Sequence, residues 1–148
     1  MAEQIVLVTG VFDLLHAEHV AFLKKARALG GTLVVGVESD VRVRALKGEG
    51  RPVNSQTVRV ANLEALQIAD RVFVLPEAFS KPEHHRALLA EIRPTILAVS
   101  SHSPHIEKKQ QLMEEFGGTV VVVHEHNPAI STSILLEQRR GIQNHGQS

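Results

Sequence analysis

The sequence predicts an α/β fold: a doubly wound, open, five-stranded parallel sheet with helices between successive strands. Five short runs are continuously apolar rather than alternating, which is typical of strands buried on both faces of a parallel sheet. Helical patterns separate these runs, so strand and helix alternate with right-handed crossovers. The 148 residues suffice for one core, and we expect a single domain over residues 1–148. The expected strands are residues 5–8, 33–37, 72–75, 96–99 and 120–123.

Helices are expected between the strands. Apolar residues recur at three- and four-residue spacing over residues 22–29 and predict the first helix. A turn is expected after Ser39, and a second helix from about residue 56 to residue 69. The Gly-Gly-Thr sequences in residues 29–35 and 116–122 predict that two helices stop at glycine just before a strand.

Two later helices carry start signals. Ser80-Lys-Pro-Glu83 predicts a capping box with proline in the first turn. Ser103 followed by Pro104 predicts an N-cap and a proline at the first helical position, opening a helix that includes Met113 and Phe116. The polar residues from about Gly141 onward are expected to be frayed.

Composition narrows the functional classes. Lys+Arg and Asp+Glu both number 16, and this balance argues against a nucleic-acid surface or a polybasic membrane patch. The chain has no cysteine, which excludes disulfides, thiolate catalysis and cysteine-based zinc sites. Its aromatic residues are all phenylalanine. No signal peptide or membrane-spanning stretch is evident, so a cytoplasmic protein is expected.

The segment Val8-Thr-Gly-Val-Phe-Asp-Leu-Leu-His-Ala-Glu-His19 predicts a ligand site. A buried strand ends at Gly10, and a helix is expected to begin near Ala17. Ligands in open parallel sheets lie beyond the carboxyl ends of the strands, where a helix N-terminus offers free N–H groups to a phosphate. His16 and His19 are three residues apart, so both imidazoles can face the same side and donate to phosphate oxygens.

These residues resemble a known family. Thr9-Gly-Val-Phe-Asp-Leu-Leu-His16, with His19, is similar to the His-x-Gly-His signature of cytidylyltransferase-like nucleotidyltransferases. Ser39-Asp40, Leu46-Lys-Gly-Glu-Gly-Arg-Pro-Val-Asn54 and Arg59 resemble bacterial heptose-1-phosphate adenylyltransferases, and glycerol-3-phosphate cytidylyltransferase domains are similar too. Ile130-Ser-Thr-Ser133 matches the closing element of the family. The resemblance covers roughly residues 5–140 and implies a Rossmann-like fold of the nucleotidyltransferase type.

The resemblance implies that an acceptor phosphate attacks the α-phosphate of a nucleoside triphosphate and releases pyrophosphate, without a covalent enzyme intermediate. His16 and His19 would stabilise the triphosphate oxygens, and Lys47 would contact phosphates from a mobile loop. Asp13 and Asp40 would orient the loop and help to bind metal or acceptor. Mg²⁺ is expected with the nucleotide and no fixed metal site on the protein; a homodimer is expected by analogy. The residues implied to bind nucleotide or phosphates are Thr9, Gly10, Val11, Phe12, Asp13, Arg59, Ser131, Thr132 and Ser133.

Three departures from the family pattern fall in the expected pocket. Glu18 stands where the family has glycine between the two histidines, and it either enters the pocket or points to solvent. The family has a Gly-rich acidic stretch after the fourth strand, but this chain has Ser100-Ser-His-Ser-Pro104, which contains no aspartate. The resemblance therefore does not predict which nucleotide base is bound. His126-Asn-Pro-Ala129 replaces Arg-Thr-x-Gly, and only His126 could partly replace the missing phosphate-binding arginine.

Two functional hypotheses follow. The first is a nucleotidyltransferase, with ATP and a sugar 1-phosphate as the leading pair and CTP with glycerol 3-phosphate as the alternative. The second is a catalytically impaired nucleotide-binding or regulatory module derived from such an enzyme. A metal site is a third interpretation, because histidines form the close pairs 16/19, 102/105 and 124/126, but it needs three or four converging ligands. His84 and His85 are expected on an exposed helix surface.

Overall fold

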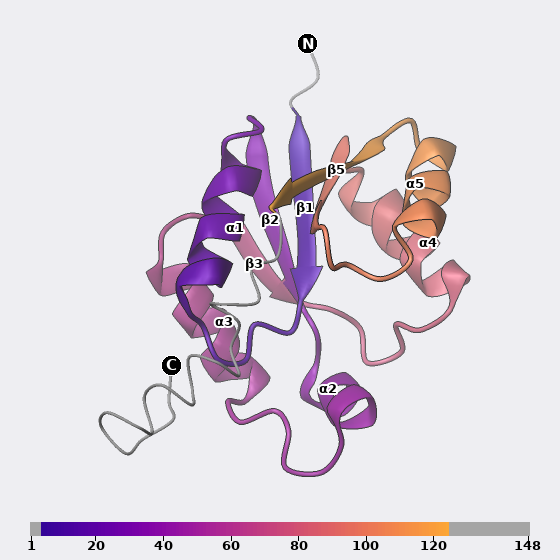
Figure 1. Cartoon of the computed structure of the whole chain (residues 1–148). Helices are drawn as coiled ribbons and strands as arrows, with labels where there is room; N and C mark the ends of the chain where they lie inside the picture. The colour runs from indigo at the N-terminus through magenta and orange to yellow at the C-terminus, as the bar shows by residue number, and fades with distance from the viewer. Residues whose placement is uncertain (1–3, 125–148) are drawn as a thin grey trace.

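The computed structural model of the chain describes residues 4–124, which form a parallel sheet with helices on both sides (Figure 1). The five strands are ordered β3-β2-β1-β4-β5 and all run parallel, which confirms the predicted open, doubly wound α/β fold. The strands are β1 (Ile5–Gly10), β2 (Thr32–Val37), β3 (Arg71–Val74), β4 (Ile96–Ser100) and β5 (Thr119–His124). The helices are α1 (Ala17–Arg27), α2 (Asp40–Lys47), α3 (Gln56–Ala65), α4 (Pro82–Ile92) and α5 (Ile106–Glu115).

The strand order reverses at β1, which lies between β2 and β4. Pairing with β2 runs the whole length of β1, from Ile5 opposite Thr32 to Gly10 opposite Val37. Pairing with β4 has a register only at Val6 opposite Ile96 and Leu7 opposite Leu97. Beyond Leu97, therefore, the carboxyl ends of β1 and β4 diverge, and a crevice opens where open α/β sheets bind ligands.

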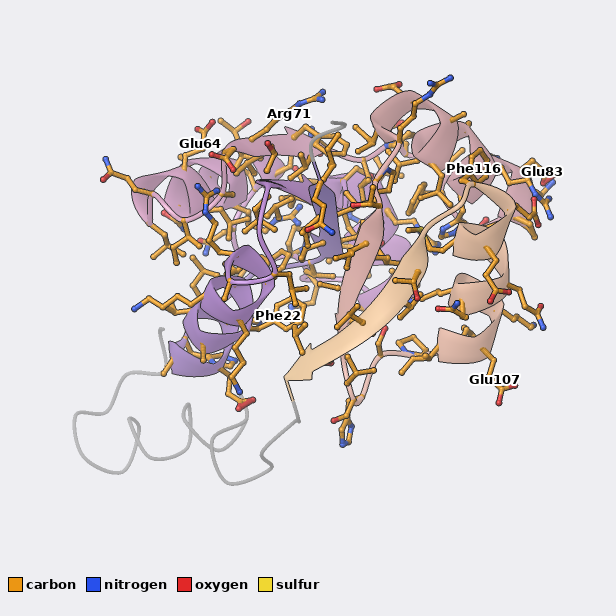
Figure 2. The ribbon with its side chains drawn as sticks, turned by 90° about the horizontal axis from the view of Figure 1, so that it is seen from above. Phe22, Glu64, Arg71, Glu83, Glu107 and Phe116 are labelled. Carbon is orange, nitrogen blue, oxygen red and sulfur yellow. The ribbon has the colours of Figure 1, made fainter. Side chains whose placement is uncertain are left out.

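Alternate residues of β1 supply the two layers of the core, as expected for a strand buried on both faces. Val6 and Val8 are buried in a cluster with Leu23 of α1 and Leu63 of α3, whereas Leu7 is buried in a second cluster with residues of α4 and α5. Seen from above, Figure 2 shows α1 with Phe22 on one side of the strands and α5 with Glu107 on the other.

Glycine ends two helices before a strand, as predicted. Gly31 has φ +74, and a Cβ at this position would lie 1.9 Å from the carbonyl oxygen of Gln4. That same carbonyl accepts a hydrogen bond from Thr32 N at 2.8 Å, which begins the pairing of β1 with β2. Gly117, with φ +78, repeats the left-handed conformation after α5.

The region after β2 differs from the expectation of a turn. Residues 40–47 form helix α2, because Ser39 is an N-cap whose Oγ accepts from Arg42 N at 3.1 Å. The next helix, α3, ends at Ala65, four residues earlier than expected. Within residues 4–124, none of the helices is long and apolar enough to cross a membrane.

The capping box and the first-turn proline predicted for α4 are confirmed, whereas the predicted N-cap residues of α4 and α5 are wrong. The N-cap of α4 is Lys81 rather than Ser80, and its backbone N–H donates to Nδ1 of His84 at 3.1 Å. Helix α5 begins at Ile106 after His105, which has φ 59, so Ser103 is not its N-cap.

Candidate active site

A cavity of about 430 Å³ lies at the crevice between the carboxyl ends of β1 and β4. The loop from β1 to α1, the end of α2, strand β4 and the loop into α5 form its walls. Seven residues that the sequence predicted for the site line it: Thr9, Gly10, Val11, Phe12, His16, His19 and Lys47. The local order of strand, loop and helix start therefore brings most of the predicted residues together at one site.

Phe12 shapes the floor of this cavity with a strained backbone. Its φ is 52, in the left-handed region that non-glycine residues rarely adopt. The ring is buried and meets His19 edge-on, with ring centroids 5.5 Å apart. A Cβ on Gly10 would lie 2.8 Å from Cε2 of Phe12, so glycine at the end of β1 leaves the space into which this ring folds. Gly10 and Phe12 thus position His19.

The two histidines form a stacked pair at the N-terminus of α1. Their ring centroids are 4.1 Å apart with the planes inclined by 28°. His16 is the N-cap of α1, and its Nδ1 accepts from the backbone N–H of Glu18 at 3.1 Å. Because Nδ1 is an acceptor, a neutral His16 carries its proton on Nε2, which can be donated to a ligand.

His19 is poised to gain a proton when an anion binds. Its Nδ1 is buried without a hydrogen-bond partner among residues 4–124. Burial, helped by the neighbouring His16 and partly opposed by Glu18, lowers the pKa of His19 to about 4. The ring is therefore neutral at pH 7 in the ligand-free protein. Phosphate oxygens beside it would favour the imidazolium and raise this pKa.

Stability should fall between pH 6.5 and about 4, because unfolded His19 binds a proton near pH 6.5 and folded His19 does so only near pH 4. In that interval the unfolded state holds more protons, and the full shift corresponds to about 3 kcal/mol. Urea unfolding at several pH values should show the loss, and His19→Gln should remove most of it. Some loss should persist in that variant, since burial also lowers the pKa of His85. Equal pH profiles would contradict the assignment to His19.

Glu18 enters the site rather than pointing to solvent. Its side chain is buried, with 6% of the residue exposed, and it lines the cavity beside the two histidines. It is the single carboxylate in that wall among residues 4–124. The substitution of glutamate for the family's glycine therefore places a negative charge where a triphosphate is expected.

Arg59 corrects a prediction. It was expected to bind phosphates or acceptor, but it is 0% exposed. Its Nε donates to the carbonyl of Asn54 at 3.0 Å, and Nη1 donates to the carbonyls of Val11 at 2.9 Å and Glu38 at 2.7 Å. Its Nη2 donates to Oδ1 of Asp40 at 2.8 Å, so Asp40 is committed as well. Arg59 thus ties three segments around the site together and is not among the residues that line the cavity.

Asp13 holds the loop that follows α2. Its carboxylate accepts from the backbone N–H groups of Val53 at 2.7 Å and Asn54 at 2.8 Å, and from Nε of Arg51 at 3.3 Å. The side-chain amide of Asn54 returns a hydrogen bond to the carbonyl of Asp13 at 2.8 Å. Asp13 is 4% exposed and does not line the cavity, so its contacts fit loop orientation rather than contact with a ligand.

Sequence reasoning missed one cation of the cavity wall. Lys109, on α5, lines the cavity together with Ser100, His102 and Ser103, and its Nζ donates to Oγ of Ser103 at 2.7 Å. A spacing signal existed: Lys109 lies one helical turn before the buried Met113, so it occupies the inward face of α5. Lys47, at the end of α2, is the exposed cation that the sequence did predict.

A second cavity, of about 120 Å³, adjoins the first on the side of α4 and α5. Thr9, Leu97 and Lys109 line both. Glu38 lines the second one, and burial raises the pKa of its carboxyl. Its Oε1 has no hydrogen-bond partner among the described residues and lies 3.8 Å from Nε of Arg42.

The metal interpretation can be compared with the structure only for the described histidines. Within residues 4–124, no three His, Asp or Glu side chains gather as metal ligands. His84 and His85 are half-buried rather than exposed: His84 caps α4, and the ring of His85 lies 4.2 Å from that of Phe79. Outside the described residues lie His126, Ser131, Thr132, Ser133 and the tail expected from Gly141.

Comparison with known proteins agrees with this geometry. The Cytidylyltransferase-like family model matches residues 7–139. Bifunctional protein HldE of Pelobacter propionicus is 39% identical over 134 residues, which cover 90% of this chain and 26% of that protein. The HldE protein of Yersinia pestis is 36% identical over 140 residues, 94% of this chain and 28% of that protein. The chain thus spans about a quarter of the length of these relatives.

Solved structures share the fold. A lipopolysaccharide core biosynthesis protein from Thermoplasma volcanium aligns with a TM-score of 0.71 and 27% identity, over 85% of this chain and 100% of that one. A pantoate-beta-alanine ligase from Francisella tularensis aligns with a TM-score of 0.63 and 16% identity, over 86% of this chain and 61% of that one. The second likeness concerns the fold alone.

Proposed function

The chain belongs to the cytidylyltransferase-like family and is a nucleotidyltransferase by class, and we propose that it transfers a nucleoside monophosphate unit from ATP or CTP to a phosphorylated sugar or polyol. An oxygen of the acceptor phosphate would attack the α-phosphorus. The bond from that phosphorus to the bridging oxygen would break, and pyrophosphate would leave. The observation that carries the proposal is the stacked pair of His16 and His19 in a cavity at the carboxyl ends of β1 and β4.

Each residue of this site has a role that fits charge stabilisation. The Nε2–H of His16 would donate to a phosphate oxygen, and His19 would take up a proton as negative charge accumulates on the leaving group. Lys47 would approach the phosphates from the end of α2, and the N-terminus of α1 adds its own positive potential. Thr9, Gly10 and Val11 form the floor on which the phosphates would lie.

ATP with a sugar 1-phosphate is the leading pair, because residues 46–54 resemble the adenylyltransferase branch and the similar Thermoplasma protein is described as acting in lipopolysaccharide core biosynthesis. CTP with glycerol 3-phosphate is the alternative. Ser131, Thr132 and Ser133 would cradle the β- and γ-phosphates. We also propose a cytoplasmic homodimer, which light scattering coupled to gel filtration tests.

We propose that Glu18 helps to hold Mg²⁺ at this site. Magnesium sites commonly combine one or two carboxylates with substrate phosphates, and Glu18 is the carboxylate that the described wall offers. Asp13 and Asp40, which the sequence suggested, are committed to the loop and to Arg59. When bound, Mg²⁺ would neutralise part of the triphosphate charge. Glu18 would hold the Mg²⁺ ion, and its negative charge would repel a triphosphate that has no Mg²⁺ bound.

The test of function is pyrophosphate release, with Mg²⁺, across ATP, CTP, GTP and UTP against sugar phosphates and polyol phosphates. Release with ATP or CTP and one of these acceptors is expected, and the active pair names the reaction. Nucleotide binding without pyrophosphate release would favour the second candidate, a catalytically impaired nucleotide-binding module. The burial of Glu18 is the observation that supports this candidate. If the chain neither released pyrophosphate nor bound a nucleotide, both candidate functions would be overturned.

Glu18→Gln separates these two candidates, because it keeps the shape and removes the charge. In EDTA, the variant should bind the nucleoside triphosphate about tenfold more tightly, since a repulsive charge is gone. In Mg²⁺ it should bind about tenfold more weakly and turn over more slowly. Calorimetry in both buffers measures the change. Faster turnover of Glu18→Gln or Glu18→Gly in Mg²⁺ would instead identify Glu18 as a suppressor and favour the impaired module.

A further inference from the structure

Lys109 occupies the boundary between the two cavities. It projects from α5 and, with Thr9 and Leu97, lines both the main cavity and the smaller one beside it. The side chain is half-buried, whereas its neighbour Lys108 on the same helix is exposed. A lysine that points inward loses hydration of its charged ammonium group. An anionic or hydrogen-bonding partner is needed to offset that cost.

The ammonium group of Lys109 retains donors for such a partner. An ammonium group has three N–H donors, and within residues 4–124 one of them is used, toward Oγ of Ser103 at 2.7 Å. Burial lowers the pKa of Lys109, and Glu38 partly restores it by charge attraction. The neutral hydroxyl of Ser103 orients the amine and does not neutralise it. In the described part of the chain, the site thus presents a positioned cation that keeps N–H donors for a ligand.

The surroundings of Lys109 distinguish its two sides. On the side of the main cavity lie the histidine pair and the expected triphosphate. On the other side lies the smaller cavity, with Glu38, His85 and Phe79 in its wall. Glu38 there has a buried oxygen, Oε1, that lacks a hydrogen-bond partner among residues 4–124. That oxygen forms a 3.8 Å ion pair with Nε of Arg42. An acceptor whose phosphate contacts Lys109 would therefore place its carbon skeleton beside a carboxylate that can still accept a hydrogen bond at Oε1.

We propose that Lys109 binds the phosphate of the acceptor at the junction of the two cavities, while Glu38 accepts hydrogen bonds from hydroxyl groups of the acceptor. This inference rests on the proposed function. It predicts that the acceptor is a phosphate monoester that carries hydroxyl groups. An acceptor with an apolar skeleton would desolvate the carboxylate of Glu38 without giving it a hydrogen bond, which costs free energy. It also supplies, from α5, a phosphate-binding cation in a chain that lacks the family's arginine before Ile130.

The experiment measures binding, so it does not depend on turnover. Glycerol 3-phosphate and inorganic phosphate are the probes, titrated into the full chain at constant ionic strength with potassium chloride. Lysine Cε–Hε signals are followed by NMR, and affinities by calorimetry. Lys109→Met removes the cation and retains the length of the side chain. Lys109→Arg restores a cation, and Lys108→Met is the matched control on the exposed face of α5.

The Lys109 signal of the unmodified chain should shift saturably with glycerol 3-phosphate, whereas the Lys108 signal should not. Lys109→Met should weaken binding of this probe by about tenfold or more, and Lys109→Arg should stay within about threefold. Binding of ATP and CTP should change by less than about threefold in either variant. Glu38→Gln should weaken glycerol 3-phosphate more than inorganic phosphate, which has no carbon-bound hydroxyl.

Three results would overturn the inference. The first is an unshifted Lys109 signal, which needs no variant to fold. The second is loss of nucleotide binding in Lys109→Met with unchanged probe binding, because the cation would then serve the triphosphate. The third is equal behaviour of Lys109→Met and Lys108→Met. A chain that binds the probes through Lys109 and releases no pyrophosphate would contradict the proposed function and leave the acceptor site standing.

Discussion

Replacing His16 by alanine is expected to lower kcat for nucleotidyl transfer by about a thousandfold. The imidazole stacks on His19 with centroids 4.1 Å apart and lines the cavity in which charge would build on the phosphates. The measurement is pyrophosphate release with the active substrate pair. Binding of the nucleoside triphosphate should weaken much less than kcat falls, because the contact matters most in the transition state.

His16 also has a structural task, and a second variant separates it from the chemical one. Nδ1 of His16 caps α1 by accepting from Glu18 N at 3.1 Å, so alanine should cost about 1 kcal/mol of stability as well. Asparagine is a good N-cap without an imidazole. His16→Asn should therefore regain the stability in urea unfolding while its kcat stays as low as that of His16→Ala.

The comparison of the two variants decides the role of the ring. If His16→Asn regained turnover within a few-fold of the unchanged chain, His16 would be a helix cap alone and the histidine pair would not be the catalytic centre. If both variants kept full turnover, the site itself would be misassigned. A matched control is Ser39→Ala, which removes the N-cap hydrogen bond of α2 at 3.1 Å and should lower stability without touching the histidines.

The part of the site that could be predicted from sequence is the part that is local. The strand ending at Gly10, the loop and the start of α1 lie within one short segment, so the positions of His16 and His19 follow from strand and helix periodicity. The structure adds the strand order, which shows that β4 is the strand beside this segment. The burial of Glu18 could not be predicted in this way, because a side chain in the first turn of a helix can point either into the site or toward solvent.

Arg59 and Lys109 show why the rest could not be predicted. Arg59 bonds the carbonyls of Val11 and Glu38, which are 48 and 21 residues away, and nothing in the residues around it signals those partners. Its functional assignment came from the resemblance alone. Lys109 and Glu38 line the same cavity only because the end of β2 and helix α5 converge on the same end of the sheet. Long-range polar contacts depend on the folded path, whereas helix and strand patterns depend on neighbours.

Arg59→Met is expected to lower the free energy of unfolding by about 4 kcal/mol, because it leaves a carboxylate and buried carbonyl groups without their donor. Arg59 is 0% exposed and donates to three carbonyls and to Oδ1 of Asp40 at 2.8 Å. Urea unfolding at equilibrium measures the loss. Arg44→Met, which changes an exposed arginine of α2, should alter the stability by less than about 0.5 kcal/mol.

Asp40→Asn tests the same network from the other side. The amide keeps an oxygen that accepts from Nη2 of Arg59 and loses the charge, so its cost should be nearer 1 to 2 kcal/mol, roughly that of a charge-assisted hydrogen bond. Such a graded loss is expected of a structural tie. A phosphate-binding arginine would behave differently: Arg59→Met would retain its unfolding midpoint and lose nucleotide affinity. That result would mean that Arg59 leaves its carbonyl partners when substrate binds, and the loops around the site would then have to be rebuilt in the complex.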